Sequence, residues 1–312
     1  MRLAFLLYPT AAVKVNEDSS FWIMRELSRR GHRVFHFESQ DLFAAGGSPH
    51  AFLTPSRLDT RKGFLPSEAS KTPIDLSRLD CVFIRKEPPF DNGYLYALQL
   101  LDLARGKIFI LNDPRGIACC NEKIFGLNLQ RFSPESLVTE NTALAKKFVK
   151  NLSTRVVVKP LNNKAGAGIF ATFWGDKNLS SLLEIATRGG RKKVLIQRFL
   201  TPVGGGDKRI LILDGKAIGT FLRKPPRLDF RANLSVGGSM HRASLSKRDR
   251  QLVEALAPLL LANGLYFVGI DVIDGYLSEI NVTSPSGIPE INALTGVRLE
   301  RQVADFIESR SG

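Results

Sequence analysis

The sequence predicts an α/β protein that begins with a doubly wound parallel sheet and continues into a smaller unit of the α+β kind. Two observations support this prediction. Between residues 1 and 112, apolar runs of strand length alternate with helical segments, as in a parallel sheet with crossover helices. After Asp113-Pro114 several strands follow one another through short turns, which is the pattern of antiparallel pairing.

The N-terminal segments form a β-α-β beginning. Asp18, Ser19 and Ser20 offer an N-cap for an amphipathic helix that Gly31 ends. Residues 44–73 are rich in Gly, Pro, Ser and Thr, which predicts an excursion or a hairpin. Strands are expected at 2–8, 34–38, 81–86 and 107–112, and a second helix at 94–106.

The second half of the chain alternates helices with hairpins. Asp214-Gly215 and Asp274-Gly275 are typical of tight hairpin turns, so each is expected to join two antiparallel strands. Helices are predicted at 120–131, 178–188, 246–264 and 298–310, strands at 155–160, 168–174, 193–200, 208–215, 216–224 and 265–282, and a loop at 225–238.

Composition limits the class of protein. The chain has 312 residues, 44 % of them hydrophobic, which is enough for two or three packed units. No run of eighteen apolar residues predicts a membrane span. The three cysteines, of which Cys119 and Cys120 are neighbours, do not form a disulfide framework, and a reducing, cytoplasmic compartment is expected.

The net charge of +14 allows two interpretations. Nucleic-acid binding is one of them. A basic surface together with a cleft for an anionic substrate is the other. The second is favoured, because the basic residues are spread along the whole chain and no nucleic-acid-binding motif is visible.

The predicted hairpin at 265–282 bears three oxygen ligands. Glu279 and Asn281 are two positions apart and therefore share a face, and a tight turn at 274–275 brings Asp271 beside Glu279. Such a set suits a hard cation such as Mg²⁺. The alternative is a polar strand facing solvent. It is disfavoured by the apolar flanking residues and by the cost of burying two carboxylates without a cation.

Two lysines are candidates for binding phosphate. Lys159 ends the apolar strand at 155–160, and Lys123 lies in the predicted helix at 120–131. A lysine that points from a strand end into a cleft suits phosphate oxygens, whereas a solvated surface charge is the alternative for each. The small and polar residues at 161–170 can fold over phosphates with their N–H groups. The strand at 196–200 can pair with an adenine edge, or it is simply a core strand.

Short segments along the chain match the motifs of one known family. They are DSSF (18–21), RKEPPFD (85–91), CNEKIF (120–125), ESLVT (135–139), VVKPL (157–161), GDKRILILDG (206–215), RxNLxxGG (231–238), FVGIDVI (267–273) and EINVTSPSGI (279–288). With these segments, nearly the whole chain resembles the bacterial glutathione synthetase family of ATP-grasp ligases. ATP-grasp ligases in general share the paired lysines and the metal hairpin, whereas RKEPPFD, CNEKIF and EINVTSP are more specific to this family.

The resemblance implies an ATP-grasp fold in three domains: an N-terminal substrate domain at 1–118, a lid at 119–202 and a catalytic domain at 203–312. It also implies an ATP-dependent ligase. The carboxylate of γ-glutamylcysteine attacks the γ-phosphate of ATP to give an acyl phosphate, and the amine of glycine then displaces phosphate. The implied cofactor is Mg²⁺, with Mn²⁺ as an alternative. A cytoplasmic homo-oligomer, a tetramer in the family, is also implied, with no membrane or nucleic-acid partner.

The resemblance further assigns site residues. For the arginines the alternative is a surface ion pair, and for Ser19 and Ser20 it is a helix cap. The residues implied for ATP are Lys123, Lys159, Asn163, Lys164, Gly166, Gln197, Arg198, Phe199, Leu200 and Asp207. Those implied for catalysis are Arg209, Arg231 and Asn233. Those implied for substrate are Ser19, Ser20, Arg85, Ser284, Ser286 and Gly287, and those for metal are Asp271, Glu279 and Asn281.

The chain departs from the family at two places. Residues 162–166 read NNKAG where the family usually has DGMGG, and Pro289 stands where a charged or polar residue is common. Two alternatives therefore stay open. One is an ATP-grasp ligase for a different acid and amine, and the other is a non-catalytic nucleotide- or nucleic-acid-binding protein. The intact metal set argues against the second.

Overall fold

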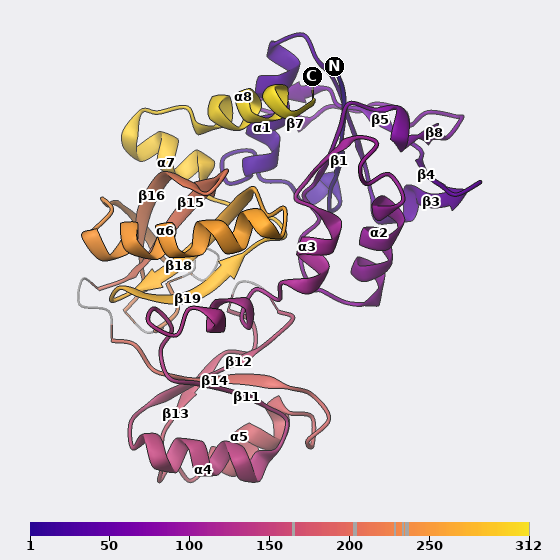
Figure 1. The fold of residues 1–312 in the computed structure, drawn as a ribbon. Coiled ribbons are helices and arrows are strands. Elements are labelled where there is room, and N and C mark those ends of the chain that lie inside the picture. Colours follow the sequence, from indigo (N-terminus) through magenta and orange to yellow (C-terminus); the bar gives the residue numbers. More distant parts are fainter. Residues whose placement is uncertain (164–165, 202–204, 228, 233, 235–236, 312) are drawn as a thin grey trace.

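The structure, a computed structural model, describes residues 1–163, 166–201, 205–227, 229–232, 234 and 237–311. Three larger sheets organise these residues, and the antiparallel sheet built from β11 to β14 stands apart from the other two (Figure 1). The two chain ends lie close together at the far end of the molecule (Figure 1). The predicted fold class, a parallel N-terminal sheet followed by a smaller antiparallel unit, is confirmed.

The N-terminal sheet has the strand order β10-β9-β1-β2-β5, with all strands parallel except β5 at one edge. Alternate residues of β1 face opposite sides, so Phe5 packs in a cluster with α1 while Leu6 packs in a cluster with α2. Helices therefore cover both faces. The elements are β1 (Arg2–Leu6), α1 (Ser19–Arg29), β2 (Arg33–Phe37), β5 (Thr54–Pro55), β9 (Cys81–Ile84), α2 (Asn92–Asp102) and β10 (Phe109–Leu111).

The expected excursion after the second strand forms two small antiparallel sheets of short strands. They are β3 (Leu42–Ala45), β4 (Ser48–Ala51) and β8 (Ile74–Asp75) in one sheet, and β6 (Leu58–Asp59) and β7 (Gly63–Phe64) in the other.

The prediction of a helix at 120–131 is wrong. The helix of this region is α3 (Pro114–Cys119), which Asp113 caps by accepting a hydrogen bond from the N–H of Arg115. The Asn121 side chain then accepts hydrogen bonds from the N–H groups of Lys123 and Ile124, which makes a turn. Only a short 3₁₀ helix follows, at Phe125–Asn128. Lys123 is therefore placed by a turn rather than by a helix.

The four-stranded antiparallel sheet has the order β11-β14-β12-β13, and α4 and α5 pack on it through a separate apolar cluster that includes Val158, Ile196 and Val149. The strand expected at 193–200 ends earlier, at Arg198. The elements are β11 (Ser136–Thr139), α4 (Thr142–Leu152), β12 (Val156–Pro160), β13 (Phe170–Thr172), α5 (Leu179–Ala186) and β14 (Val194–Arg198), of which β11 and α4 were not predicted.

The C-terminal sheet has the order β17-β16-β15-β18-β19 and contains both predicted hairpins. Ile210 packs in the cluster that includes α6, and Leu211 packs in the cluster that includes α7 and α8. The elements are β15 (Asp207–Leu213), β16 (Lys216–Lys224), β17 (Ser239–Arg242), α6 (Lys247–Ala262), β18 (Phe267–Ile273), β19 (Tyr276–Asn281), α7 (Ile288–Thr295) and α8 (Leu299–Ser311), of which β17 and α7 were not predicted.

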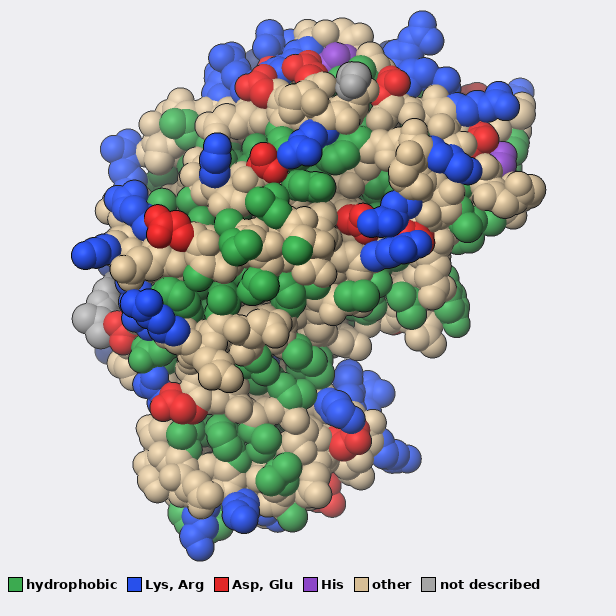
Figure 2. Space-filling view, viewed as in Figure 1, with side chains coloured by type: hydrophobic (Ala, Val, Ile, Leu, Met, Phe, Trp, Pro, Cys, Tyr) green, Lys and Arg blue, Asp and Glu red, His purple; other side chains and the backbone are tan. Residues whose placement is uncertain are grey.

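On the face that Figure 2 shows, charged side chains are spread over the surface and are not gathered in one patch. Lys and Arg side chains appear over every part of this face, and acidic side chains stand beside several of them (Figure 2). Within the described part of the chain, no helix combines the length and the apolar character that crossing a membrane requires.

Asn112 joins the N-terminal sheet to the C-terminal sheet. It follows β10, and only 2 % of it is exposed. Its Oδ1 accepts a hydrogen bond from the N–H of Phe267 at 2.8 Å, and its Nδ2 donates to the carbonyl oxygens of Phe267 at 2.8 Å and Val282 at 3.0 Å. One side chain thus satisfies three buried backbone groups of β18 and of the segment after β19.

We expect Asn112→Ala to lower the free energy of unfolding by at least about 1–3 kcal/mol, because it leaves buried backbone groups without partners. Urea denaturation followed by circular dichroism measures the change. The control is Asn128→Ala, which removes an exposed side chain bonded to the Phe125 carbonyl and should stay within about 0.5 kcal/mol of the parent. Equal losses in the two variants would contradict the role given to Asn112.

Candidate active site

Two cavities meet at the hairpin of β18 and β19. Asp271 and Glu279 lie opposite each other on these strands, as predicted, and both side chains line both cavities. The pair is therefore a wall that the cavities share. One cavity, of about 250 Å³, lies toward the four-stranded sheet and is lined by Lys159, Gln197 and Phe230 among others. The other, of about 510 Å³, lies toward the N-terminal sheet and is lined by Ser19, Arg85 and Ser286 among others.

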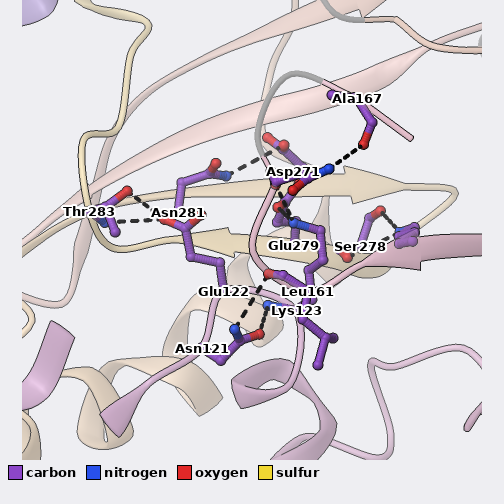
Figure 3. A network of polar contacts seen from close by, with 12 residues as sticks. Asn121, Glu122, Lys123, Leu161, Ala167, Asp271, Ser278, Glu279, Asn281 and Thr283 are labelled. Atoms are coloured by element: carbon purple, nitrogen blue, oxygen red, sulfur yellow. Dashed lines mark hydrogen bonds and ion pairs between the residues drawn. The ribbon is translucent and has the colours of Figure 1, made fainter. Parts of the chain in front are cut away.

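The pairing of Asp271 with Glu279 depends on a bulge. The turn at 274–275 pairs Ile273 with Tyr276, and counting back from there would place Ser278 opposite Asp271. The register shifts between Asp271 and Val272, which puts Glu279 in that place. Asn281 lies beside them, and its Nδ2 donates to the Gly269 carbonyl at 3.3 Å and to Asp271 Oδ2 at 3.5 Å (Figure 3).

Two arginines hold the Asp271 carboxylate, which is buried. Arg209 contacts it with both Nε and Nη2, at 2.6 and 3.2 Å, and Arg223 Nη2 lies 2.9 Å from its Oδ1. Arg223 Nε also donates to Asp207 Oδ1 at 2.5 Å. Burial alone would raise the pKa of Asp271, but Arg209 and Arg223 outweigh it and hold that pKa well below its usual range.

Arg223 is a site residue that the sequence analysis missed. It lies on β16, in the hairpin whose turn is at 214–215. Counting from that turn places Leu222 opposite Asp207, but a bulge between Leu211 and Ile212 shifts the register and brings Arg223 there instead. The bulge leaves no plain signal in the sequence, so the Asp207–Arg223 pair could not be found by counting.

Both predicted lysines are buried, so the surface-charge alternative is wrong for each. Lys123 Nζ lies 2.8 Å from Glu279 Oε1 and donates to the Asn163 carbonyl at 2.8 Å (Figure 3). Lys159 Nζ donates to Gln197 Oε1 at 2.9 Å and to Ser278 Oγ at 3.0 Å. Burial lowers the pKa of Lys159 to about 8.

The 250 Å³ cavity gathers most of the residues expected at ATP. Its aromatic side is formed by Phe199 and Phe230, whose rings meet edge to face with centroids 5.7 Å apart. Arg231 is paired with Asp229 and donates to the Gly166 carbonyl at 3.2 Å, so it ties the loop after β16 to the loop after β12. The expected residues that line this cavity are Lys159, Gly166, Gln197, Arg198, Phe199, Leu200, Asp207 and Arg231. Lys164 and Asn233 fall outside the described residues.

Ser19, which lines the 510 Å³ cavity, and its neighbour Ser20 are hydrogen-bonded to other segments rather than capping α1. The helix cap is Asp18, which accepts from the N–H of Phe21. Ser19 Oγ accepts from the N–H groups of Gly287 and Ile288, both at 3.2 Å, and Ser20 Oγ accepts from Arg85 Nε at 2.9 Å. The helix-cap alternative for these two serines is therefore wrong, and they connect α1 to the residues around it.

Arg85 is the largest fully buried side chain, with 1 % of it exposed. Its guanidinium group lies near the rings of Phe83 and Phe267, and its Nη2 donates to the Pro285 carbonyl at 2.9 Å. Its Nη1 has no hydrogen-bond partner among the described residues. Ser284 and Ser286 line the same cavity, whereas Gly287 contributes its backbone as the residue before α7.

Glu122 is a second residue that the sequence analysis missed. Its Oε1 accepts from the N–H groups of Val282 and Thr283 and from the Thr283 hydroxyl, at 2.8 to 3.2 Å (Figure 3). It thereby fixes the turn that bears Lys123 against the end of β19. Burial raises the pKa of Glu122, and the nearby Glu279 adds to that effect.

The side chains at the shared wall carry the kinds of ligand atom that a hard cation prefers. Asp271 and Glu279 supply carboxylate oxygens and Asn281 an amide, and Mg²⁺ prefers such ligands together with phosphate and water. The carboxylates are at present neutralised by Arg209, Arg223 and Lys123. The described residues contain no group of three or more His, Cys, Asp or Glu side chains placed to hold a metal, so the candidate set is two carboxylates and one amide.

Solved structures of ATP-grasp ligases share this fold. The D-cycloserine synthetase DcsG has a TM-score of 0.68 at 14 % identity, over 98 % of this chain and 100 % of its own. The ATP-grasp ligase PsnB, in complex with a minimal precursor, Mg and ADP, has a TM-score of 0.63 at 16 % identity, over 99 % of this chain and 97 % of its own. With the two cavities and the paired lysines, these likenesses define a protein of the ATP-grasp fold, a class of ligases that use ATP and Mg²⁺.

Two family models match the sequence and identify the family of this chain. The family model of the prokaryotic glutathione synthetase N-terminal domain matches residues 1–118, and that of its ATP-grasp domain matches residues 122–296. The chain belongs to the prokaryotic glutathione synthetase family and is an ATP-dependent carboxylate–amine ligase. The glutathione synthetase of Synechococcus elongatus is 39 % identical over 99 % of this chain and 98 % of its own length, and that of Nitrosomonas europaea is 39 % identical over the same shares.

We expect Arg223→Met to lower the free energy of unfolding by about 3–5 kcal/mol at neutral pH, because Asp207 and Asp271 lose a buried cation. Without Arg223, burial holds the pKa of Asp207 above its value in the unfolded chain. The folded variant then binds more protons, and its stability falls as pH rises between those two pKa values. Urea denaturation at a series of pH values measures both effects.

The matched control for this variant is Arg242→Met, which changes an exposed arginine on the neighbouring strand β17. It should alter stability by no more than about 0.5 kcal/mol. A pH-independent loss in Arg223→Met would mean that packing rather than charge explains its effect.

Proposed function

We propose that this chain joins γ-glutamylcysteine to glycine, with conversion of ATP to ADP and phosphate through an acyl phosphate. Membership of the family over the whole chain supports the reaction. The observation that carries the proposal is the wall that Asp271 and Glu279 form between two cavities. A nucleotide on one side of this wall and a substrate carboxylate on the other would meet at the carboxylates and the basic side chains.

We assign the 250 Å³ cavity to ATP. Its aromatic residues suit the adenine ring, and Asp207 suits the ribose. Lys123 and Lys159 would hold phosphate oxygens after giving up their present partners, with the loop at Asn163, Lys164 and Gly166 over them. Mg²⁺, or alternatively Mn²⁺, would be held by Asp271, Glu279 and Asn281 and would neutralise charge on the phosphates.

We assign the 510 Å³ cavity to the donor peptide. Arg85 offers a guanidinium nitrogen without a partner among the described residues, which suits a carboxylate of the donor. Ser284, Ser286 and the backbone at Gly287 would complete this site, and Ser19 and Ser20 would act by holding Gly287 and Arg85 in place. Arg209, at the shared wall, and Arg231, at the ATP cavity, would stabilise the charge that develops on the transferring phosphoryl group, with Asn233 in support.

The larger organisation is also proposed. We divide the chain into a substrate domain at 1–118, a lid at 119–202 and a catalytic domain at 203–312. The resemblance to the family favours a homo-oligomer, a tetramer, in the cytoplasm, and three free cysteines agree with a reducing compartment. We assign the net charge of +14 to anionic substrates rather than to nucleic acid, because buried Lys and Arg side chains line both cavities.

The reaction is tested by measuring phosphate release from ATP with γ-glutamylcysteine and glycine, beside a panel of other dipeptides and amines. We expect turnover with the first pair to exceed turnover with every other pair, and the product to be glutathione by mass spectrometry. The panel matters because Pro289 and the 162–166 loop differ from the family pattern. Turnover with a different pair, and none with γ-glutamylcysteine and glycine, would replace the proposed substrates.

We expect Glu279→Gln to lower kcat at least about a hundredfold, because an amide cannot supply the anionic oxygen that this site gives to a cation. The fold should persist, since a glutamine oxygen can still accept from Lys123. Phosphate release and a thermal melt followed by circular dichroism measure the two properties. Glu140→Gln, at an exposed ion pair with Lys193, is the control. Full activity of Glu279→Gln would refute the metal assignment.

A further inference from the structure

Glu290 is a buried carboxylate with an unsatisfied oxygen. It lies in the first turn of α7, which packs beside β16 (Figure 1), and only 8 % of the residue is exposed. Its Oε2 has no hydrogen-bond partner among the described residues, and within the same part of the chain no basic side chain forms an ion pair with it. The preceding residue, Pro289, brings neither a charge nor an N–H.

This carboxylate stands between two hollows. It lines the 510 Å³ cavity that also contains Arg209, Arg223 and Asp271. It also lines an outer hollow of about 930 Å³, whose wall includes Trp22. A molecule that enters from the outer hollow therefore meets Glu290 before it reaches the wall formed by Asp271 and Glu279.

An unpaired buried anion is costly, so this position needs a positive ligand group or a proton. Burial raises the pKa of Glu290 and the nearby Glu17 adds to the rise, whereas the backbone N–H of Glu290, Arg209 and Arg223 only partly oppose it. Those two arginines are already committed to Asp271 and Asp207. An ammonium group would supply both the positive charge and the hydrogen-bond donor that Glu290 Oε2 lacks among the described residues.

The acceptor in the proposed reaction carries an ammonium group, which needs a binding site. An acceptor amino acid binds in its protonated form, but only the free amine can attack an acyl phosphate. The geometry points to Glu290 as the residue that binds the ammonium group of the acceptor and removes one of its protons. This inference rests on the proposed function. It goes beyond that function by naming the base of the second half-reaction.

In the proposed step Glu290 acts as the base and phosphate is the leaving group. One ammonium proton moves to the Glu290 carboxylate, and the amine nitrogen forms a bond to the acyl carbon. The bond from that carbon to the phosphoryl oxygen breaks, its electron pair leaves with phosphate, and the second proton goes to the departing phosphate. Glu290 then returns its proton to solvent through the outer hollow.

The acidic groups near the proposed donor site at Arg85 are different from Glu290. Asp18, which accepts from the Tyr8 hydroxyl, and Glu87 are the acidic groups that act on Arg85. Glu290 instead has Arg209 and Arg223 as its basic neighbours, and these hold the carboxylate at the shared wall. The acceptor attacks only after the acyl phosphate has formed, and the outer hollow would give it an entrance separate from the donor site.

The test compares glycine with hydroxylamine as the acceptor, with ATP and γ-glutamylcysteine present in both cases. Hydroxylamine is largely uncharged at neutral pH and traps an acyl phosphate without the help of a base. For Glu290→Gln we expect kcat/KM for glycine to fall about 10²–10⁴-fold, while the rate of hydroxamate formation stays within the range of the control. The KM values for ATP and γ-glutamylcysteine should stay unchanged.

The control is Glu26→Gln, which makes the same change at a buried carboxylate on α1 that is paired with Arg29 and Arg30. Its activity should equal that of the parent and its melting temperature should fall, whereas Glu290→Gln should melt at or above the parent. If Glu290→Gln does not fold, Glu290→Asp takes its place, with the same selective loss for glycine expected.

Unchanged kinetics with glycine, or equal losses with glycine and hydroxylamine, would overturn the role of Glu290. If the parent enzyme forms neither glutathione nor hydroxamate from γ-glutamylcysteine, the proposed substrates have failed instead, and the two failures are thereby distinguished.

Discussion

The Asp271 carboxylate, buried between Arg209 and Arg223, is the constraint on which the rest of the site depends. Asp271 lies on β18 and forms ion pairs with Arg209 on β15 and Arg223 on β16, so it connects three neighbouring strands of the sheet. A buried carboxylate is tolerated when cations and hydrogen bonds satisfy it, and two guanidinium groups do so here. Because Arg223 also holds Asp207, one ion-pair network connects Asp207, which lines the 250 Å³ cavity, with Arg223 and Asp271, which line the 510 Å³ cavity.

The cations and anions of the site are already paired with one another. Lys123 is paired with Glu279, Lys159 bonds to Gln197 and Ser278, and Asp271 has its arginines. If ATP and a divalent cation bind as proposed, the site would exchange partners: the lysines would move to phosphate and the carboxylates to the metal. Such an exchange avoids the penalty of leaving buried charges unpaired at any stage. Arg85 Nη1 and Glu290 Oε2 have no hydrogen-bond partner among the described residues, and Arg223 Nη2 has none beyond its ion pair with Asp271.

The sequence predicted the elements that have a strong periodic pattern and missed those that depend on register or on local capping. The four parallel strands and the two hairpins were predicted correctly, because apolar runs and Asp-Gly turns mark them. The helix at 120–131 was wrong, because Asp113 and Asn121 cap and turn the chain earlier. Arg223 was missed because a one-residue bulge brings it to Asp207. Glu290 was missed because the role proposed for it rests on an oxygen without a hydrogen-bond partner among the described residues, which a sequence does not reveal.

The described residues at the two places where this chain departs from its family are not those of the shared wall, Asp271 and Glu279. In the 162–166 segment, Lys123 is bonded to the backbone carbonyl of Asn163, and a backbone carbonyl does not depend on which side chain stands there. Position 166 is a glycine, which suits its backbone φ of +74°. Pro289 occupies the first turn of α7, where no intrahelical N–H donor is needed, so the helix that carries Glu290 is kept. Gly166 lines the 250 Å³ cavity and Pro289 lines the outer hollow, so the described residues of these two segments leave Asp271, Glu279 and their basic partners unaltered.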